Sequence, residues 1–435
     1  MMKKSAILLL LLFAALAAGA QPFYRKPVAP VRNVIVMIPD GTSTSVLAAA
    51  RWYKFYNDPS QRTLNLDSCL CGLVGSFSSD SPIPCSAPAM SAYMTGMPQQ
   101  AGNVSVYPAA NPAQDIVEVE SGRACQPLAT LLEAAKHDRG KAAGLVVTVD
   151  FCHATPAACA SHHYSRHAYP ALAAQMAAND LDVMFGGGVE GLAAYADCFT
   201  PYTARDADKL DARFSRADGL WTPFSTLPVV LIYNNKLLSA ARVTGWHDLL
   251  SPAFRGHIAF ADPEISGSCF TSLVTMTAAL GNDWREDIRS FAKNLDGRQL
   301  DSSGAVLDQV ADGGAWLGVT LEETALKYVS GGADVGIVYP KEGTSAVPDA
   351  SALVKGAPHE DNAKKFLDFT VSQDVQRLLG ERFYRRSVRT DVPTGESLPD
   401  LERISFVDYD VDWASENREG VLMTWAFCLD EEETA

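Results

Sequence analysis

The sequence predicts an α/β protein, because short apolar runs alternate with stretches of helical periodicity. Four runs have the length and the β-branched content of strands buried on both faces: residues 33–38, 144–149, 228–233 and 334–339. Helical patterns occupy other segments, at 127–136 and 363–379. This alternation is typical of largely parallel sheets covered by helices. We therefore expect a layered α/β architecture.

The chain begins with the features of a secretory signal peptide. A pair of lysines precedes an apolar run at 6–16, and Ala18-Gly19-Ala20 has the small residues of a cleavage site. A membrane anchor is the alternative, but the apolar segment is shorter than the roughly 20 residues that span a bilayer. We expect cleavage after Ala20 and a mature chain that is periplasmic or secreted.

Length and composition restrict the function classes. With 435 residues, of which 47% are hydrophobic, the chain can form two or three domains with substantial cores. A formal net charge of −15 opposes binding to a phosphate backbone, so we expect no nucleic-acid partner. The nine cysteines are an odd number and show no C-x-x-C metal spacing.

Candidate catalytic residues occur in the first half of the chain. Asp40 follows the apolar run of "NVIVMIPDGTS", at a strand end where α/β sheets place ligands and metals, with a simple turn residue as the alternative. Ser86 in "CSAPAMSAYMTG" stands where a helix begins. It is therefore an N-cap, a nucleophile at a phosphate-binding helix terminus, or both. A serine nucleophile needs a base or a metal ion.

A further motif, "FCHATPAACASHHYSRH", concentrates groups that bind metals and phosphate. It contains His153, Thr155 and Arg166, and the planar guanidinium of an arginine suits two phosphate oxygens. His163 and His167 have the i, i+4 spacing of metal-binding histidines on a helix, with a surface pair as the alternative.

These three motifs, in this order and at these separations, resemble the N-terminal part of the alkaline phosphatase family over residues 31–188. The resemblance implies zinc and magnesium as cofactors of an active phosphatase. It also implies roles for five residues: Ser86 as nucleophile, Arg166 as phosphate clamp, Asp40 as bridging metal ligand, and His153 and Thr155 beside a third metal.

Two features depart from that family. Cys85 stands where many members carry an Asp before the nucleophile. The Asp and His residues that bind the metals in the later part of that family's chain are not found in this sequence, so it lacks most ligands of a two-metal centre.

The second half contains two helix starts that suit an anion. Small hydroxyl residues and glycine precede apolar helical patterns at 266–268 and 302–304, where free backbone N–H groups converge. Ordinary helix capping is the alternative for both. A third motif, "YPKEGTS", follows a predicted strand and is either part of a ligand site or a surface turn. The candidate ligand-binding residues are Ser266, Gly267, Ser268, Ser302, Ser303, Tyr339, Glu342, Gly343 and Thr344.

The surrounding segments resemble the periplasmic substrate-binding proteins of ABC importers, in the branch that handles ferric iron and small phosphorylated or anionic solutes. The resemblance rests on "GLWTPFSTLPVVLIYNNKLL", "GWHDLLSPAFRGHIAFADPEISGSCF" and "GGADVGIVYPKEGTS", and covers about residues 181–430. It implies a type 2 two-lobe module, an anionic or phosphorylated solute, and an ABC importer permease as partner. Ferric receptors place tyrosines side by side, whereas Tyr328, Tyr339 and Tyr384 are scattered, which favours an oxyanion over iron.

The two resemblances meet inside "LDVMFGGGVEGLAAYADCFTPY", where the helix and strand before Gly188 fit both families. We expect a signal peptide at 1–20, a partial alkaline-phosphatase-like α/β/α domain at 21–188, and a binding-protein-like domain without its first strands at 181–435. No Gly/Ser or Pro-rich linker separates them, so the parts should share an interface. A gene fusion, or a joining error upstream of the sequence, would produce such a chain.

Three functions remain open. The first is a secreted binding module for an anionic solute, which has the longer matched stretch. The second is a metal-dependent phosphomonoesterase, which has the sharper motifs but lacks most zinc ligands. The third is a non-functional chimera whose truncated parts keep only local structure, with unpaired strand edges and exposed apolar faces.

Overall fold

The computed structural model describes residues 34–433, apart from positions 148, 180, 186–187, 301 and 396–397. The expected signal peptide therefore lies outside the described residues. The chain divides into two compact units, Met1–Val74 and Gly75–Ala435.

The first unit contains one long helix, α2 (Thr44–Asn57), which begins behind Ser43 because the serine side chain accepts a hydrogen bond from the Val46 backbone N–H. An ion pair between Arg51 and Asp67 links α2 to the short 3-10 helix η1 (Asn65–Cys69). The prediction of a strand at 33–38 is wrong for its described part, because residues 34–38 form no strand and their side chains are exposed. A strand needs a neighbour, and the described part of this unit offers none.

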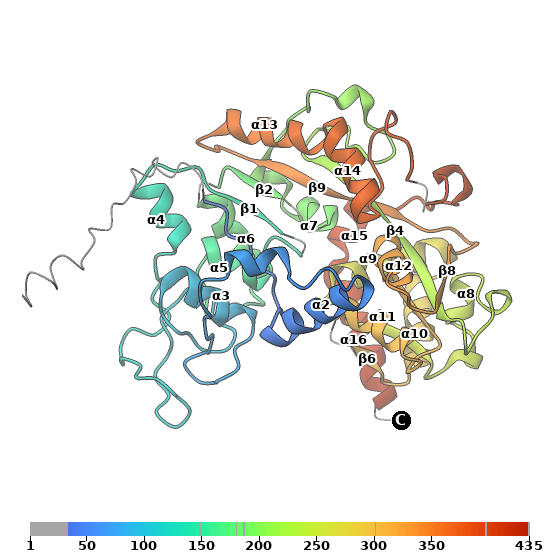
Figure 1. The fold of residues 1–435 in the computed structure, drawn as a ribbon, viewed down its shortest axis with the longest axis horizontal. Coiled ribbons are helices and arrows are strands. Elements are labelled where there is room, and N and C mark those ends of the chain that lie inside the picture. The colour runs from blue at the N-terminus through green and yellow to red at the C-terminus, as the bar shows by residue number, and fades with distance from the viewer. Residues whose placement is uncertain are drawn as a thin grey trace, which may run out of the picture. The chain divides into compact units, whose positions relative to one another are not determined.

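The second unit is built on one nine-stranded sheet with the order β1-β2-β9-β4-β7-β5-β6, in which β3 also pairs with β9 and β8 with β4 (Figure 1). The strands are β1 (Gly144–Val146), β2 (Val183–Phe185), β3 (Phe199–Thr200), β4 (Thr222–Asn234), β5 (Ile258–Ala261), β6 (Gln299–Leu300), β7 (Leu317–Leu321), β8 (Val335–Val338) and β9 (Ala346–Val354). The predicted runs at 144–149, 228–233 and 334–339 thus overlap β1, β4 and β8.

The sheet is mixed, so the expectation of largely parallel sheets is wrong. Only the pairs β1/β2, β5/β6 and β5/β7 are parallel within the described residues. The long strand β4 runs antiparallel to β9 through its first half and antiparallel to β7 through its second half. An apolar run reports burial on both faces of a sheet, but it does not report the direction of its neighbours.

One hydrophobic core combines the two regions that the sequence separates. Helices of the first region lie beside β1 and β2 (Figure 1): α3 (Ser86–Thr95), α4 (Leu131–His137), α5 (Ala154–Ala160) and α6 (Tyr169–Ala178). Helix α7 (Val189–Ala194) follows the junction and contacts β9. Buried side chains of the first region, such as Leu145 of β1 and Leu172 of α6, share a core with Trp221, Val347 and Ala352 from the second region. Strand β2 pairs with β9, so the two regions also share the sheet.

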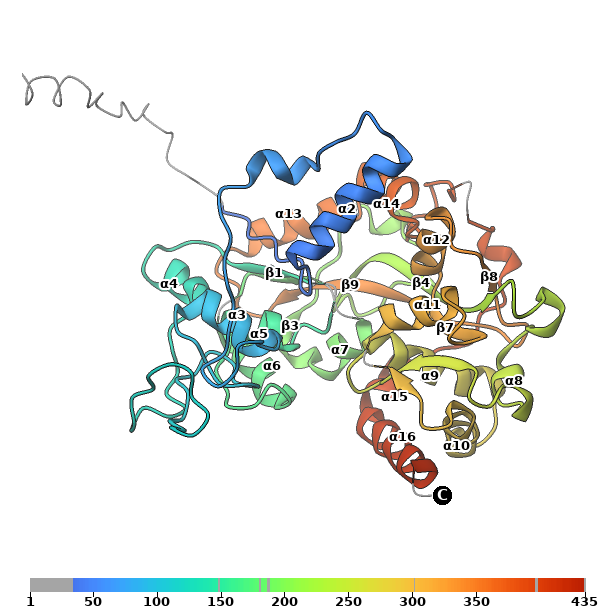
Figure 2. The same cartoon turned by 60° about the horizontal axis from the view of Figure 1, so that its bottom comes forward.

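A second core lies wholly in the second region and includes Phe260, Phe291 and Trp425. Its helices are α8 (Trp246–Leu249), α9 (Gly267–Leu280), α10 (Trp284–Leu295), α11 (Ser303–Ala311), α12 (Glu322–Ser330) and α16 (Arg418–Glu433). Helix α10 packs against α16 near the C-terminus (Figure 2). The remaining helices are α13 (Glu360–Thr370), α14 (Gln373–Phe383) and α15 (Val411–Glu416).

The two helices that the sequence predicts have different bounds in the structure. The single helix expected at 363–379 is two helices, α13 and α14, because the chain turns at Val371 and Ser372. The helix expected at 127–136 begins at Leu131, where Thr130 forms a capping box with Glu133. No helix within the described ranges is long and apolar enough to cross a membrane.

Asp182, at the start of β2, joins segments that lie on both sides of it in the sequence. Its buried carboxylate accepts hydrogen bonds from the Ala143 N–H at 2.7 Å and from the His359 N–H at 2.7 Å. The His359 ring Nδ1 lies 2.8 Å from the same carboxylate, and Lys136 Nζ lies 3.4 Å from it. The regions therefore share an interface, as the absence of a linker predicts.

Candidate functional site

The two helix starts predicted to bind an anion lie at one edge of the sheet. Strand β5 pairs in parallel with β6, and the register places Ala261 opposite Leu300. The chain leaves these two strands at the same edge and enters α9 and α11. Parallel β7 ends at this edge too, where α12 begins. Ligands commonly bind at such carboxyl ends of α/β sheets.

The start of α9 is a capped terminus with several hydroxyls. Ser266 is the N-cap, and its side chain accepts a hydrogen bond from the Cys269 N–H at 3.4 Å. Its hydroxyl also lies 3.1 Å from that of Ser268. Ser268, Thr271 and Thr275 follow one another at helical spacing, so they share one side of the helix, which we call the hydroxyl face of α9.

The start of α11 repeats the cap in a simpler form. Ser302 is the N-cap and accepts a hydrogen bond from the Ala305 N–H at 3.3 Å, while Ser303 is the first helical residue. Both serine motifs therefore cap helices, as the capping alternative expected. Capping uses one donor of each terminus and leaves others available to an anion.

The four candidates of the strand-end motif make bonds within the chain. Tyr339 donates its hydroxyl to Glu322, at the start of α12. The Glu342 carboxylate accepts from the Trp246 N–H at 3.0 Å and lies 2.8 Å from His247 Nδ1. The other two contacts are Trp246 Nε1 donating to the Gly343 carbonyl and Thr344 Oγ1 donating to the Val229 carbonyl. Of the four, Tyr339 bonds to a residue at the sheet edge where α9, α11 and α12 begin, because Glu322 is the first residue of α12.

A buried ion pair accompanies Tyr339. Arg386 donates from Nε and Nη2 to the two Glu322 carboxylate oxygens, at 2.7 and 2.8 Å, and both side chains are almost fully buried. Burial and the neighbouring Glu322 carboxylate raise the pKa of the Tyr339 hydroxyl. The hydroxyl therefore stays protonated and acts as a donor. The sequence reasoning missed Glu322 and Arg386, because their spacing carries no local signal.

Glu190 is a second residue that the sequence reasoning missed. It lies in the first turn of α7 and is buried, and its Oε1 accepts hydrogen bonds from Thr271 Oγ1 and from the Tyr409 hydroxyl, both at 2.7 Å. Burial, followed by the Glu190 charge, raises the pKa of Tyr409 well above its ordinary value. The glycines before Glu190 were the available signal, since a Cβ at position 188 would lie 2.7 Å from Oε2 of Glu190.

The phosphatase-like residues are distributed over both units. Asp40 belongs to the first unit, and the others to the second. Cys85 is the N-cap of α3 and Ser86 is its first helical residue, so the expectation of Ser86 as N-cap is wrong. His153 is the N-cap of α5, Thr155 lies in the first turn of that helix, and α3 packs against α5.

Arg166 and His153 are brought together, with 3.1 Å between Arg166 Nη2 and His153 Nε2. The idea of His163 and His167 as a pair on one helix is wrong, because residues 161–168 are not helical. His163 instead stacks on Tyr164, and its Nδ1 accepts from the Ser165 N–H at 3.0 Å.

The described residues do not fit a two-zinc centre. Across residues 34–433 with the gaps given above, no three His, Cys, Asp or Glu side chains approach one another closely enough to hold a metal ion. A two-metal phosphatase needs one cation for the nucleophile and one for the leaving oxygen.

Residues 176–411, more than half of the chain, match the family of bacterial extracellular solute-binding proteins. The chain belongs to this family. Residues 31–216 match alkaline phosphatase, so the two matches overlap at the junction. The N-terminal part of this solute-binding protein resembles alkaline phosphatases, and its C-terminal part resembles periplasmic substrate-binding proteins.

Curated relatives include an uncharacterized protein, a solute-binding protein and an alkaline phosphatase. An uncharacterized protein of Haemophilus influenzae is 27% identical over 56% of this chain and 75% of its own length. A putative 2-aminoethylphosphonate-binding periplasmic protein of Salmonella typhi is 26% identical over 43% of this chain and 59% of its own length. The human tissue-nonspecific alkaline phosphatase is 30% identical over 43% of this chain and 38% of its own length. The chain thus spans 59% of the phosphonate-binding relative and 38% of the phosphatase.

Solved structures establish the fold. The periplasmic binding protein AfuA of Actinobacillus pleuropneumoniae, with fructose-6-phosphate bound, has a TM-score of 0.51 and 22% identity, covering 57% of this chain and 83% of its own. The ferric binding protein of Campylobacter jejuni also has a TM-score of 0.51, with 20% identity, 57% of this chain and 84% of its own. The solute-binding protein described here therefore has the mixed α/β fold of periplasmic binding proteins.

Proposed function

We propose that this chain binds a small phosphorylated or otherwise oxyanionic solute outside the cytoplasm and delivers it to an ABC importer permease. The observation that carries the proposal is the parallel pairing of β5 with β6, because it brings the starts of α9 and α11 to one sheet edge. Backbone N–H groups and the positive ends of two helix dipoles suit a phosphate or phosphonate group there. Relatives named for binding a phosphonate or fructose-6-phosphate support this ligand class.

The net charge of −15 is compatible with such a site. Affinity would come from charge-assisted hydrogen bonds of about 1.5–3 kcal/mol each, rather than from a basic surface. Binding should therefore depend on salt less than attraction to a basic surface would, because the donors are helix termini and hydroxyls rather than exposed charged side chains.

Calorimetry against inorganic phosphate, fructose 6-phosphate and ferric citrate tests the proposal. We expect heat of binding with at least one of the two phosphates. Ser268→Ala and Ser303→Ala should each weaken binding about tenfold, whereas Ser372→Ala, a serine before α14, should leave it unchanged. If only one helix start is used, only one of the two variants will weaken binding.

The absence of heat with all three probes, in protein shown to be folded, would contradict a receptor function. A clear preference for ferric citrate would redirect the assignment to iron. Equal weakening by Ser372→Ala would show that the effect is not specific to the sheet edge.

A metal-dependent phosphomonoesterase is the second candidate, because the alkaline phosphatase match includes Ser86, Arg166 and Asp40. Zinc and magnesium would be its cofactors. The poor fit of the described side chains to a two-zinc centre makes solute binding the better-supported function.

A further inference from the structure

Glu190 is bound to the hydroxyl face of α9, the helix whose start belongs to the proposed anion site. Thr271, whose hydroxyl donates to Glu190, lies one turn after Ser268 on that face. The next hydroxyl, of Thr275, is 2.6 Å from that of Ser345. The hydroxyl face therefore points toward α7 and the start of β9, with a carboxylate of the chain already bound to it.

The contact has the features that a bound oxyanion would have. Oε1 of Glu190 receives two hydroxyl donors at 2.7 Å, from Thr271 and Tyr409, and the side chain is 6% exposed. Hydroxyl donors to a negatively charged oxygen in a buried place form strong hydrogen bonds. The carboxylate thus uses donors that a phosphate at the same face would require.

The charges nearby do not compensate for a second anion. Asp150 lies close enough for the Glu190 charge to raise its pKa, although burial contributes more and Arg418 acts in the opposite sense. The Arg418 guanidinium is 3.8 Å from the Asp150 carboxylate and stacks over the Phe270 ring of α9. The Glu190 charge also acts on Asp349, which pairs with Arg385. Arg385 in turn lies 3.6 Å from Glu323. Two guanidiniums therefore stand among four carboxyl groups, so an added oxyanion would be repelled while Glu190 stays.

We propose that Glu190 competes with the solute for the hydroxyl face of α9, so that an oxyanion must displace its carboxylate in order to bind there. The inference rests on the proposed function and adds the residue that sets its affinity. Helix α7 belongs to the segment that both family matches cover, so this competitor comes from the junction of the two regions.

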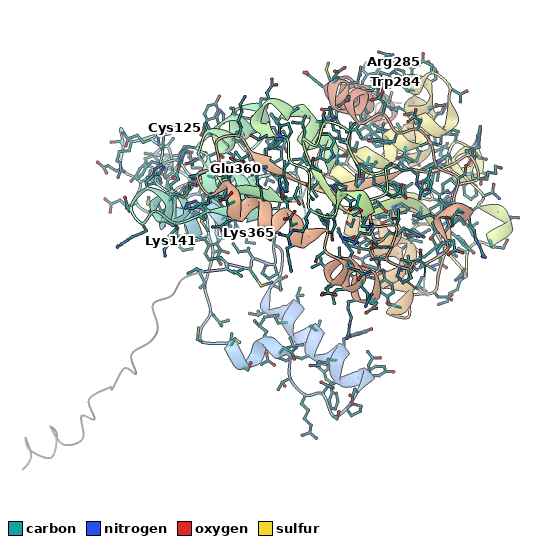
Figure 3. The ribbon with its side chains drawn as sticks, turned by 90° about the horizontal axis from the view of Figure 1, so that it is seen from above. Cys125, Lys141, Trp284, Arg285, Glu360 and Lys365 are labelled. Atoms are coloured by element: carbon teal, nitrogen blue, oxygen red, sulfur yellow. The ribbon has the colours of Figure 1, made fainter. Side chains whose placement is uncertain are left out.

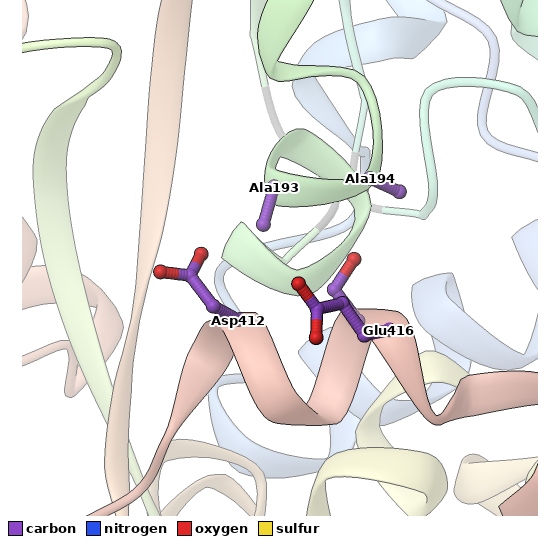
Figure 4. A pocket seen from close by; sticks show the side chains of 5 residues that line it. Ala193, Ala194, Asp412 and Glu416 are labelled. Atoms are coloured by element: carbon purple, nitrogen blue, oxygen red, sulfur yellow. The ribbon is translucent and has the colours of Figure 1, made fainter.

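The neighbouring hollow provides a matched control. It lies between α7 and α15 and is lined by Ala193, Ala194, Asp412, Ser415 and Glu416 (Figure 4). Ala193 and Ala194 follow Glu190 by one helical turn, and Glu416 is an exposed carboxylate of the opposite helix. Glu416→Gln changes the net charge as Glu190→Gln does, but Glu416 is exposed on α15 and is not the carboxylate bound to Thr271 of α9.

The test is calorimetry of the full mature chain with inorganic phosphate and fructose 6-phosphate. Glu190→Gln keeps the size of the side chain and removes its charge, so we expect about tenfold tighter binding of both probes than in the wild type. Glu190→Asp keeps both hydroxyl donors and shortens the side chain that occupies them, so it should give a smaller gain, about threefold. Glu416→Gln should bind as the wild type does.

Equal or weaker binding by folded Glu190→Gln, with binding intact in the wild type, would overturn the competition and leave the proposed function standing. No binding by any variant would overturn both. If Glu190→Gln shows no cooperative unfolding, Glu190→Asp decides: tighter binding supports competition, and unchanged or weaker binding contradicts it.

Discussion

The region around Ser86 and the sheet edge at α9 and α11 differ in how their chemistry is encoded. The first has motifs that are specific in sequence, yet its described side chains supply no metal cluster. The second has only capping serines in sequence, yet the pairing of β5 with β6 assembles two helix starts. A functional site needs all of its chemical groups close together in the folded chain, and a local motif supplies only some of them.

The two regions are nevertheless parts of one folded unit. Figure 3 shows Cys125 and Lys141 near one end of the second unit and Trp284 and Arg285 near the other, with Glu360 and Lys365 on α13 between them. The core around Leu172 belongs to both regions, and the core around Phe291 belongs to one. Variants that break this sharing test the comparison.

The largest effect is expected from Asp182→Ala at the junction. The change leaves the Ala143 and His359 N–H groups and the buried Lys136 ammonium without the carboxylate that binds them. We expect the free energy of unfolding to fall by about 4 kcal/mol in urea denaturation. Asp197→Ala, at an exposed carboxylate of the same segment, is the control and should change it by less than about 0.5 kcal/mol.

If Asp182→Ala and its control were equally stable, the carboxylate would not join the two regions. The shared sheet would then have to hold them together by itself.

A smaller effect is expected from Leu172→Ala in the shared core, about 3 kcal/mol of lost stability from burial and cavity terms. Leu273→Ala in the second core is the matched variant, since both leucines are fully buried. Because the cores share one sheet, each variant should shift a single unfolding transition seen by both tryptophan fluorescence and circular dichroism. Two separate transitions, with only one shifted, would show that the cores unfold independently.

The His162–Glu133 pair makes the stability of the shared core depend on pH. Burial lowers the pKa of His162. Hydrogen bonds with Glu133, at 2.9 Å, and with the Ser105 carbonyl raise it by more, so the pKa of His162 lies above 6.5. Burial raises the pKa of Glu133, but hydrogen bonds from His162, Thr130 and Asn179 lower it from 4.5 to about 2. The stability that protonated His162 contributes is therefore present below pH 6.5 and is lost as the pH rises through the pKa of His162 in the folded protein. The stability that ionised Glu133 contributes is present above pH 4.5 and is lost as the pH falls toward 2.

Urea denaturation from pH 4 to 9 should therefore show His162→Gln losing roughly 1.5 kcal/mol near pH 6 and less at pH 9. His167→Gln, at an exposed histidine, should keep the wild-type pH profile. A loss that is the same at every pH would mean that the ring stabilises the core by packing alone.

The smallest effect is expected for hydrolysis. Purified protein with zinc and magnesium should show little turnover of an aryl phosphate, and Ser86→Ala should not change it, because the described residues assemble no two-metal centre. Robust hydrolysis that Ser86→Ala abolishes would reverse the comparison between the two regions and favour a phosphatase.

The sequence by itself determined the two family resemblances, the strands that became β1, β4 and β8, and the serine caps of α9 and α11. These features depend on residues close together in the chain, where periodicity and capping chemistry act. The sequence also placed the change of family at 181–188, and the two family matches overlap there.

Three features could be seen only in the folded chain: the direction of the strand pairs, the core shared by the two regions, and the partners of Asp182 and Glu190. Thr271 lies 81 residues from Glu190, and Tyr409 lies 219 residues from it. A local pattern reports whether a side chain is buried or caps a helix, but it cannot report which distant group meets it. That choice depends on sheet register and on the burial of charge, which exist only once the chain is folded.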